Sequence, residues 1–380
     1  MMKKWLASFI MVAFVLLSAC QQAPSETISS ATLPPGSFEE SEGKLTKIKF
    51  EMPVESQYDP KVPFILKIDA PVYYDGYTSA PSYICLPAKF DNTDSAAKLF
   101  FGDQYDEIQR TEDHDTTGIS WPYETPLLWV EKYSSLAPYY YSLEFIHSLG
   151  TIIGNGNSGL GGASISNLED VWKTGDKDGD GRASDMKRSR EECLAQAQAF
   201  IDALGLDMLL VRTDVLDLTE LQLYRFYFGH NYDGIPSSIG VNATMCQYSW
   251  GLSEGEFMTI YVCDAGIYKI QAMLYDVIET KEAQPIISAQ EAVTKLIEAA
   301  QVYPFPISAY LADGHVIDSI SLVYLPQAVE GDGVDVIGDE RGGGLMRNMI
   351  PAWQFSTGYS YGRWSAMEMY IDARTGEYLQ

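Results

Sequence analysis

Hydrophobic and polar positions alternate in short runs between residue 45 and about residue 165. Residues 45–50 and 64–68 are examples, and Pro and Gly interrupt the runs throughout. Alternation with a period of two places apolar side chains on one face of a strand, and Pro and Gly are typical of the turns between strands. The pattern predicts a β-rich N-terminal domain over residues 45–165. We also expect a short helix near residues 94–100, and a glycine-rich loop at residues 154–162 that ends the domain.

The pattern changes to a helical period after residue 188. Ser189 and Glu192 form a capping box, in which each side chain satisfies a free main-chain donor of the first turn. Gly205 is typical of the residue that follows a helix end. Apolar residues between these signals recur at helical spacing, at Leu194, Ala197, Ile201 and Leu204.

A second copy of this pattern begins 99 residues later, at Ser288, and predicts an internal repeat. Ser288 and Glu291 form the same box, and apolar residues follow at Val293, Leu296, Ile297 and Ala300. The two copies then share strand-like runs, an Ile-Pro pair and a closing strand with a turn. These lie at residues 221–228, 235–236 and 261–266 in the first copy, and at 317–325, 350–351 and 370–376 in the second. The predicted fold class is α+β, with units of helix plus antiparallel sheet over residues 166–285 and 286–380.

Two stretches of the second copy point to a known type of domain. Residues 350–355 are Ile-Pro-Ala-Trp-Gln-Phe, and residues 369–379 are Met-Tyr-Ile-Asp-Ala-Arg-Thr-Gly-Glu-Tyr-Leu. They resemble the end of a PepSY-type domain, as it occurs in extracytoplasmic accessory regulators of histidine kinases and in a function-unassigned group of bacterial lipoproteins. The resemblance covers residues 184–380. It implies two PepSY-like units that bind and regulate a partner protein, and it supplies no catalytic residue.

The N-terminus has the three parts of a lipoprotein signal peptide. Lys3 and Lys4 precede a thirteen-residue apolar run at residues 5–17, shorter than the ~20 residues of a membrane-spanning helix. Leu-Ser-Ala-Cys at residues 17–20 resembles a lipobox. We therefore expect cleavage after residue 19, lipid on Cys20, and a membrane-anchored protein outside the cytoplasm. The alternative is an ordinary secretory signal with a chance cysteine. Residues 20–44 are rich in Ser, Thr, Pro and Glu, which predicts a disordered tether.

The charge of the chain excludes some classes of partner. The formal net charge is −26, from 26 basic and 52 acidic side chains. Nucleic acid binding requires clustered Lys and Arg, so no nucleic acid partner is expected. The same negative charge argues against electrostatic binding of the protein surface to anionic lipid, so the acyl chains of Cys20 should provide the membrane contact.

Four cysteines remain beside Cys20, without the spacing of a zinc site. Cys246 and Cys263 flank a turn-like segment at residues 251–255. If this segment closes a hairpin, the two cysteines lie on neighbouring strands at a distance that a disulfide can span. Two buried free thiols are the alternative.

Residues 176–181 match the first half of a calcium-binding loop. Carboxylates stand at loop positions 1, 3 and 5, and Gly181 stands at position 6, where the chain turns sharply. Position 12 is Lys187 in place of the usual Glu. The predicted calcium ligands are Asp176, Asp178, Asp180, the main-chain carbonyl of Arg182, and Asp185. A solvated acidic turn is the alternative.

No residue pattern in the chain is typical of a catalytic site. The histidines, at positions 114, 147, 230 and 315, form no local cluster and are expected at the surface or in packing roles. Aromatic residues such as Trp353 are expected in the core. The sequence therefore favours a non-catalytic lipoprotein that binds or regulates an envelope protein. The alternative function is capture of a peptide or carbohydrate in an aromatic-lined cleft.

Overall fold

The computed structural model describes fourteen stretches of the chain, and the account below is confined to them. They are residues 33–54, 64–88, 98–100, 109–111, 127–132, 141–146, 172–176, 186–217, 222–239, 255–264, 266–302, 316–328, 346–357 and 368–379. Within these residues no helix has the length and apolar character that a membrane crossing requires. Strands predominate, and two longer helices accompany them, which agrees with the predicted α+β class.

The first sheet combines strands from both ends of the chain. Its order is β1-β2-β3-β17-β18-β19-β20, with β5 paired to β18 and β15 paired to β5. All neighbours are antiparallel except β17 and β3, which are parallel. The strands are β1 (Phe38–Ser41), β2 (Lys44–Val54), β3 (Phe64–Tyr73), β5 (Tyr83–Pro87), β15 (Tyr275–Thr280), β17 (Ile317–Ala328), β18 (Arg347–Thr357), β19 (Glu368–Asp372) and β20 (Tyr378–Leu379).

The second sheet uses the middle of the chain. Its order is β6-β7-β8-β14-β13-β11-β10-β9, and β12 pairs with β11. A short separate pair joins β4 (Ser79–Ala80) to β16 (Gln284–Pro285). The strands of the second sheet are β6 (Gln109–Thr111), β7 (Leu127–Lys132), β8 (Tyr141–Ile146), β9 (Trp172–Asp176), β10 (Met208–Asp217), β11 (Gln222–Tyr232), β12 (Ile235–Pro236), β13 (Phe257–Cys263) and β14 (Gly266–Met273).

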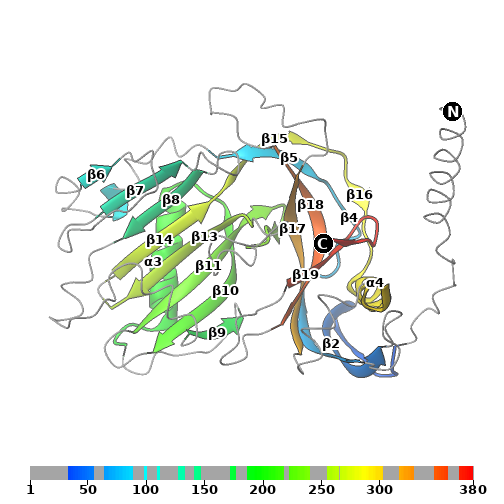
Figure 1. Ribbon diagram of the computed structural model, residues 1–380. Coiled ribbons are helices and arrows are strands. Elements are labelled where there is room, and N and C mark those ends of the chain that lie inside the picture. The colour runs from blue at the N-terminus through cyan, green and yellow to red at the C-terminus, as the bar shows by residue number, and fades with distance from the viewer. Residues whose placement is uncertain are drawn as a thin grey trace, which may run out of the picture. The chain divides into compact units, whose positions relative to one another are not determined.

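Helix α3 (Arg190–Ala203) lies on β11, β13 and β14 of the second sheet (Figure 1). The predicted capping box is confirmed, because the hydroxyl of Ser189 accepts from the main chain of Glu192 and the Glu192 carboxylate accepts from the main chain of Ser189. Ile201 is buried as predicted, whereas Leu194 is only partly buried. The buried face of the helix therefore differs slightly from the predicted one, and it is formed by Cys193, Ala197, Phe200 and Ile201.

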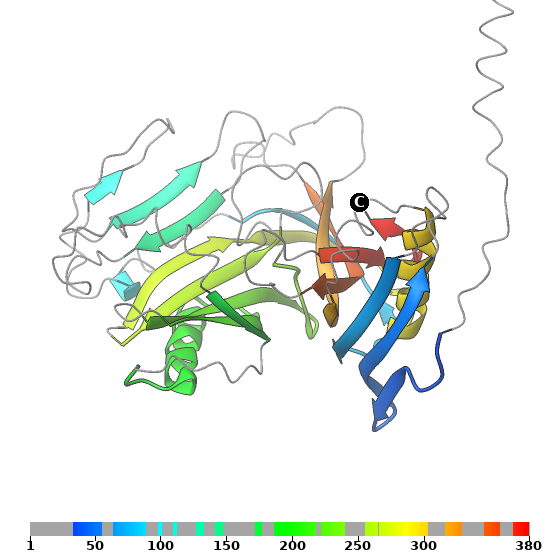
Figure 2. The ribbon, with the colours of Figure 1, turned by 60° about the horizontal axis from the view of Figure 1, so that its bottom comes forward.

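Helix α4 (Ala289–Val302) packs on β2, β19 and β20 of the first sheet (Figure 2). The second capping box is also present, since Glu291 N–H donates to Ser288 Oγ and Ser288 N–H donates to the Glu291 carboxylate. Val293 and Ala300 have no exposed surface, as the helical spacing predicted. The predicted core residue Trp353 is buried, and its indole N–H donates to the carbonyl of Ile287 just before the helix.

Each helix is followed by four antiparallel strands that pair in chain order. After α3 the order is β10, β11, β13 and β14, and after α4 it is β17, β18, β19 and β20. Tyr261 and Tyr370 both lie on the third strand of their set.

Two of the predicted correspondences between the two copies are wrong. Residues 221–228 largely fall on a second strand but 317–325 on a first, and Pro236 follows the second strand whereas Pro351 lies inside it. A residue before Pro is extended in either position, so an Ile-Pro pair does not distinguish them.

The expected N-terminal domain and tether also differ from the structure. The described strands of residues 45–165 form no sheet of their own, because β3 and β5 pair with β17 and β18, and β8 pairs with β14. These pairings are distant in the sequence, and local periodicity does not encode them. The expected tether contains β1, which pairs with β2 across a two-residue turn. Glu42 and Gly43 both have positive φ there, which is typical of hairpins.

Candidate functional site

The end of β11 forms a tight hairpin with β12. Asp233 and Gly234 have φ of +52° and +91°, and Tyr232 pairs with Ile235 across them. A Cβ at Gly234 would lie 2.5 Å from the Tyr77 hydroxyl, so the turn needs glycine for space as well as for conformation. His230 and Tyr232 are two residues apart on β11, so both side chains point to the same face of the strand.

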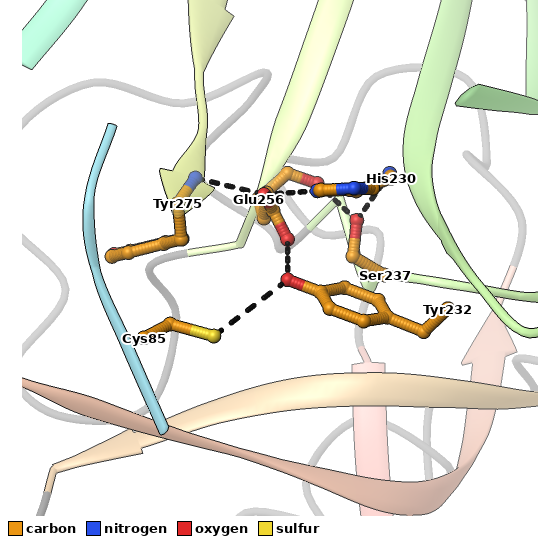
Figure 3. A network of polar contacts seen from close by, with 6 residues as sticks. All are labelled: Cys85, His230, Tyr232, Ser237, Glu256 and Tyr275. Carbon is orange, nitrogen blue, oxygen red and sulfur yellow. Dashed lines mark hydrogen bonds and ion pairs between the residues drawn. The ribbon is translucent and has the colours of Figure 1, made fainter. Parts of the chain in front are cut away.

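Glu256 lies directly before β13, and its side chain is completely buried. Its Oε1 accepts from His230 Nδ1 at 3.0 Å and from the main-chain N–H of Tyr275 at 2.8 Å. Its Oε2 accepts from the Tyr232 hydroxyl at 2.7 Å (Figure 3). A carboxylate only accepts hydrogen bonds, so Nδ1 carries the hydrogen of the imidazole. Three donors compensate for the burial of this side chain, which would otherwise be costly.

Ser237 fixes the main chain around this carboxylate. Its Oγ donates to the carbonyl of Glu256 at 2.8 Å and accepts from the N–H of His230 at 2.7 Å. The Ser237 N–H donates to the carbonyl of His230 at 2.8 Å. A Cβ at Gly229 would lie 2.4 Å from the Ser237 carbonyl oxygen, so glycine permits this close approach. Ser, His and Glu are the residue types of a hydrolytic triad, but this hydroxyl bonds to main chain and not to the imidazole.

The environment holds Cys85 and Tyr232 in their neutral forms. The Cys85 Sγ lies 3.9 Å from the Tyr232 hydroxyl. Burial, together with the charge of Glu256, raises the pKa of the Cys85 thiol to about 12. The same two causes raise the pKa of Tyr232 well above its ordinary value. A thiol must ionise to attack or to bind a metal, so Cys85 is a packing residue at neutral pH.

The pKa of His230 shifts in the direction that favours its charged form. Burial lowers the pKa of this imidazole, but the hydrogen bond to Glu256 and the charge of Glu256 outweigh burial and raise it above 6.5. Asp207 and Asp276 add smaller contributions of the same sign. We call Cys85, His230, Tyr232, Ser237, Glu256 and Tyr275 the Glu256 network.

Aromatic and polar contacts extend the Glu256 network to strands of the first sheet. The ring of Tyr232 lies 4.9 Å from that of Tyr83 on β5 and 5.0 Å from that of Tyr324 on β17. Ser238 N–H donates to the carbonyl of Tyr324 at 2.7 Å, and Ser238 Oγ lies 2.8 Å from the hydroxyl of Tyr370 on β19. The network therefore lies where strands of both sheets meet.

A second group of polar side chains lies further along β11, on the face opposite α3. Asp214 is completely buried and accepts two hydrogen bonds from each of two guanidinium groups, those of Arg212 and Arg225, at 2.7–3.1 Å. Burial alone would raise the pKa of Asp214, but the two charges outweigh it and lower the pKa. Both guanidinium groups also lie over the ring of Tyr227, at 4.6 and 5.1 Å. We call Arg212, Asp214, Arg225, Tyr227 and Thr259 the Asp214 cluster.

Two hydroxyl groups of the Asp214 cluster are buried without a hydrogen-bond partner among the described residues. They are those of Tyr227 on β11 and Thr259 on β13, which are directly paired across the two strands. Most buried polar groups in folded proteins are hydrogen-bonded, so an exception requires an explanation. This face of the second sheet has hydrogen-bonding capacity that the described residues do not use.

Most of the predicted site residues lie outside the described residues. These are Cys20, Asp178, Asp180, Arg182, Asp185 and Cys246. Asp176 is the last residue of β9, opposite Arg212, and no group of metal-binding side chains occurs among the residues that the structure describes. The calcium site stays a prediction.

The hairpin and the disulfide expected between Cys246 and Cys263 stay predictions, because Cys246 lies outside the described residues. Cys263 is buried at the end of β13, and among the described strands β13 pairs with β11 and β14. The sequence analysis also assigned His230 no role beyond surface or packing. Glu256 is 26 residues away from it, and only the Asp-Gly turn after β11 could have drawn attention to this region.

Comparisons with known proteins identify no family. Neither a protein-family model nor a curated protein matches the chain. Among solved structures, the chain is similar to an uncharacterized protein from Eubacterium rectale ATCC 33656, whose crystal structure was determined at 1.45 Å resolution. The two chains are 16% identical with a TM-score of 0.49, over 88% of this chain and 93% of the other. This likeness carries no argument about function.

Proposed function

We propose that the protein is a lipid-anchored, non-catalytic binding or regulatory protein that acts on another protein of the cell envelope. The observation that carries the proposal is the repeated order of one helix and four antiparallel strands, namely β10, β11, β13 and β14 after α3 and β17, β18, β19 and β20 after α4. This order supports the interpretation of residues 166–285 and 286–380 as two PepSY-like units. Proteins with such domains act by binding partners.

The Glu256 network supports a role without catalysis. It contains Ser, His, Glu, Tyr and Cys, yet both hydrogen bonds of the serine hydroxyl go to main chain. The thiol of Cys85 is held neutral by burial, and Glu256 uses both oxygens to accept from His230, Tyr232 and Tyr275. A carboxylate has about four acceptor positions, and structural hydrogen bonds use three of those of Glu256, which makes it a poor general base.

Ligand capture is the second candidate, and the Asp214 cluster favours it. The unpaired hydroxyls of Tyr227 and Thr259 lie beside two guanidinium groups and an aromatic ring. Sites for small polar molecules combine aromatic surface with a few such polar groups. Binding of a sugar or peptide at this face would slow hydrogen exchange on β11 and β13, whereas partner-protein binding elsewhere would leave these strands unchanged.

The proposed function is tested by crosslinking in intact cells, with identification of the captured envelope protein. The anchored wild-type protein should give a defined product. Cys20→Ala should remove that product, because loss of the acyl chains takes the protein away from its partner. Ser25→Ala, five residues further along the chain, is the matched control and should behave as wild type. Equal crosslinking by Cys20→Ala, or no envelope protein captured by the wild type, would contradict the proposal.

A further inference from the structure

One edge of the first sheet is exposed along β15. Among the described strands β15 pairs only with β5, and residues 276–285 are all exposed. Beyond β15 the same edge continues, since Lys281 N–H donates to the carbonyl of Ser82 and β16 pairs with β4. Such an edge presents unused main-chain donors and acceptors to solvent, and another extended chain can pair with them.

Two neighbouring apolar side chains make this edge suited to binding. Val277 and Ile278 are 41% and 46% exposed, which places them among the most exposed large apolar residues that the structure describes. The strand has a bulge here, because Val277 lies opposite Cys85 and Glu279 lies opposite Ile84, which leaves Ile278 as the extra residue. Branched apolar residues favour extended structure and pack well against an added strand.

The charges along the edge select the kind of chain that can be added. Asp276, Glu279 and Glu282 are exposed, against one exposed basic residue, Lys281. A second copy of this protein, with its formal net charge of −26, would be repelled. A segment that carries Lys or Arg between apolar residues would instead be attracted to the edge and aligned on it.

We propose that residues 275–285 bind an extended, basic segment of an envelope protein, which is added to the first sheet as a strand next to β15. The inference rests on the proposed binding function and names the surface and the chemistry of the partner. Main-chain hydrogen bonds to β15 hold the added strand, contact with Val277 and Ile278 contributes affinity, and the three acidic residues give specificity.

The test uses the full-length protein and a ten-residue peptide of alternating Lys and Val as the probe. Two further peptides serve as comparisons, one with Glu in place of Lys and one of equal charge with Pro at alternate positions. Pro cannot donate to a strand, so the Pro peptide keeps the charge but loses pairing. Binding is measured by calorimetry at two salt concentrations, and the site is located by hydrogen exchange of the protein.

The Lys-Val peptide should bind and protect amides of residues 276–280, whereas the Glu and Pro peptides should not. Ile278→Lys should weaken this binding about tenfold, because it replaces an apolar contact with a repelling charge. Ile65→Lys is the matched control, since Ile65 on β3 is equally exposed at 46%, and it should leave binding unchanged. Equal binding of the three peptides, equal loss in both variants, or protection only outside residues 275–285 would each overturn the proposal.

A photocrosslinking residue at position 278 or position 65 in cells separates this inference from the proposed function. Capture of an envelope protein from position 278 alone supports both. Capture only from position 65, or only through Cys20-dependent contacts elsewhere, is consistent with the binding function. It would overturn the proposal that residues 275–285 bind the partner. Loss of all capture overturns the function itself.

Discussion

The Glu256 network and the Asp214 cluster are two buried polar groups on the same strand, β11, with different balances of hydrogen bonds. Each centres on a carboxylate without exposed surface. The carboxylate of Glu256 is surrounded by three uncharged or weakly basic donors, and the hydroxyls of Tyr232 and Ser237 beside it each donate a hydrogen bond. The carboxylate of Asp214 is held by two guanidinium groups, while the nearby hydroxyls of Tyr227 and Thr259 have no hydrogen-bond partner among the described residues.

The difference shows what each group contributes. A carboxylate whose two oxygens are paired in the interior fixes one arrangement of the strands that provide its donors, here β11 and β15. The Asp214 cluster contributes charge pairing to stability, and two of its hydroxyls have no partner among the described residues. The first group therefore contributes to how the two sheets are joined, and the second to the packing of β10 and β11 within one sheet.

The largest effect is expected from the centre of the Asp214 cluster. Asp214→Ala leaves the guanidinium of Arg225, which is 1% exposed, without its buried counter-charge. Breaking a buried pair on one side costs about 3–5 kcal/mol of unfolding free energy, measured by denaturant titration. Asp69→Ala removes an exposed carboxylate that pairs with Lys47 and Lys49, and it should leave the unfolding midpoint nearly unchanged. Similar unfolding midpoints for both variants would contradict the large contribution of Asp214 to the free energy of unfolding.

A smaller loss is expected from the Glu256 network. Tyr232→Phe removes the hydroxyl that donates to Glu256 Oε2 and keeps the ring between Tyr83 and Tyr324. An unsatisfied buried acceptor costs about 1–3 kcal/mol, so the free energy of unfolding should fall by that amount. An unchanged stability would show that Glu256 finds another donor.

Tyr227→Phe is the matched change in the other group and should have almost no effect. Tyr227 lies on the same strand and is buried like Tyr232, but its hydroxyl has no partner to lose. The free energy of unfolding should therefore change by less than about 0.5 kcal/mol, or rise slightly. A loss as large as that of Tyr232→Phe would mean that the Tyr227 hydroxyl is hydrogen-bonded in solution, and the contrast between the two groups would disappear.

The smallest effect concerns pH. The folded protein raises the pKa of His230 above 6.5, mainly because Glu256 outweighs burial. A raised pKa in the folded state means that this contribution to stability is complete below pH 6.5 and is lost as the pH rises through the folded pKa. Unfolding titrations should show stability falling over that window. His230→Gln should flatten this part of the profile, and an unchanged profile would contradict the assignment.

The sequence predicted the local structure of this protein better than it predicted which strands pair with each other. Both capping boxes are confirmed, because the motif and its hydrogen bonds lie within four residues. Trp353 and the apolar positions of α4 are buried as their spacing indicated. The division into an N-terminal domain failed, since β3 pairs with β17 across more than two hundred residues. The repeat was aligned on short strand motifs, which do not distinguish the first strand from the second.

The Glu256 network could not be predicted for the same reason. Its members come from β5, β11 and β15, from the residue after β12 and from the residue before β13, and their spacing in the sequence matches no catalytic or metal-binding motif. The hairpin at Asp233 and Gly234 was visible as a turn signal. The burial of Glu256 next to this hairpin could not be predicted, because it depends on how two distant strands pair in the folded chain.

Glu256 joins the two sheets by accepting hydrogen bonds from His230 and Tyr232 on β11 and from the main chain of Tyr275 on β15. Hydrogen exchange of the Glu256→Ala protein measures how far this joining depends on one side chain. The loss of one carboxylate leaves His230, Tyr232 and the Tyr275 amide without their acceptor. Exchange should become faster on β5, β15 and β17 of the first sheet as well as on β11 and β13 of the second. Faster exchange confined to β11 and β13, with the first sheet as protected as in the wild type, would contradict this role of Glu256.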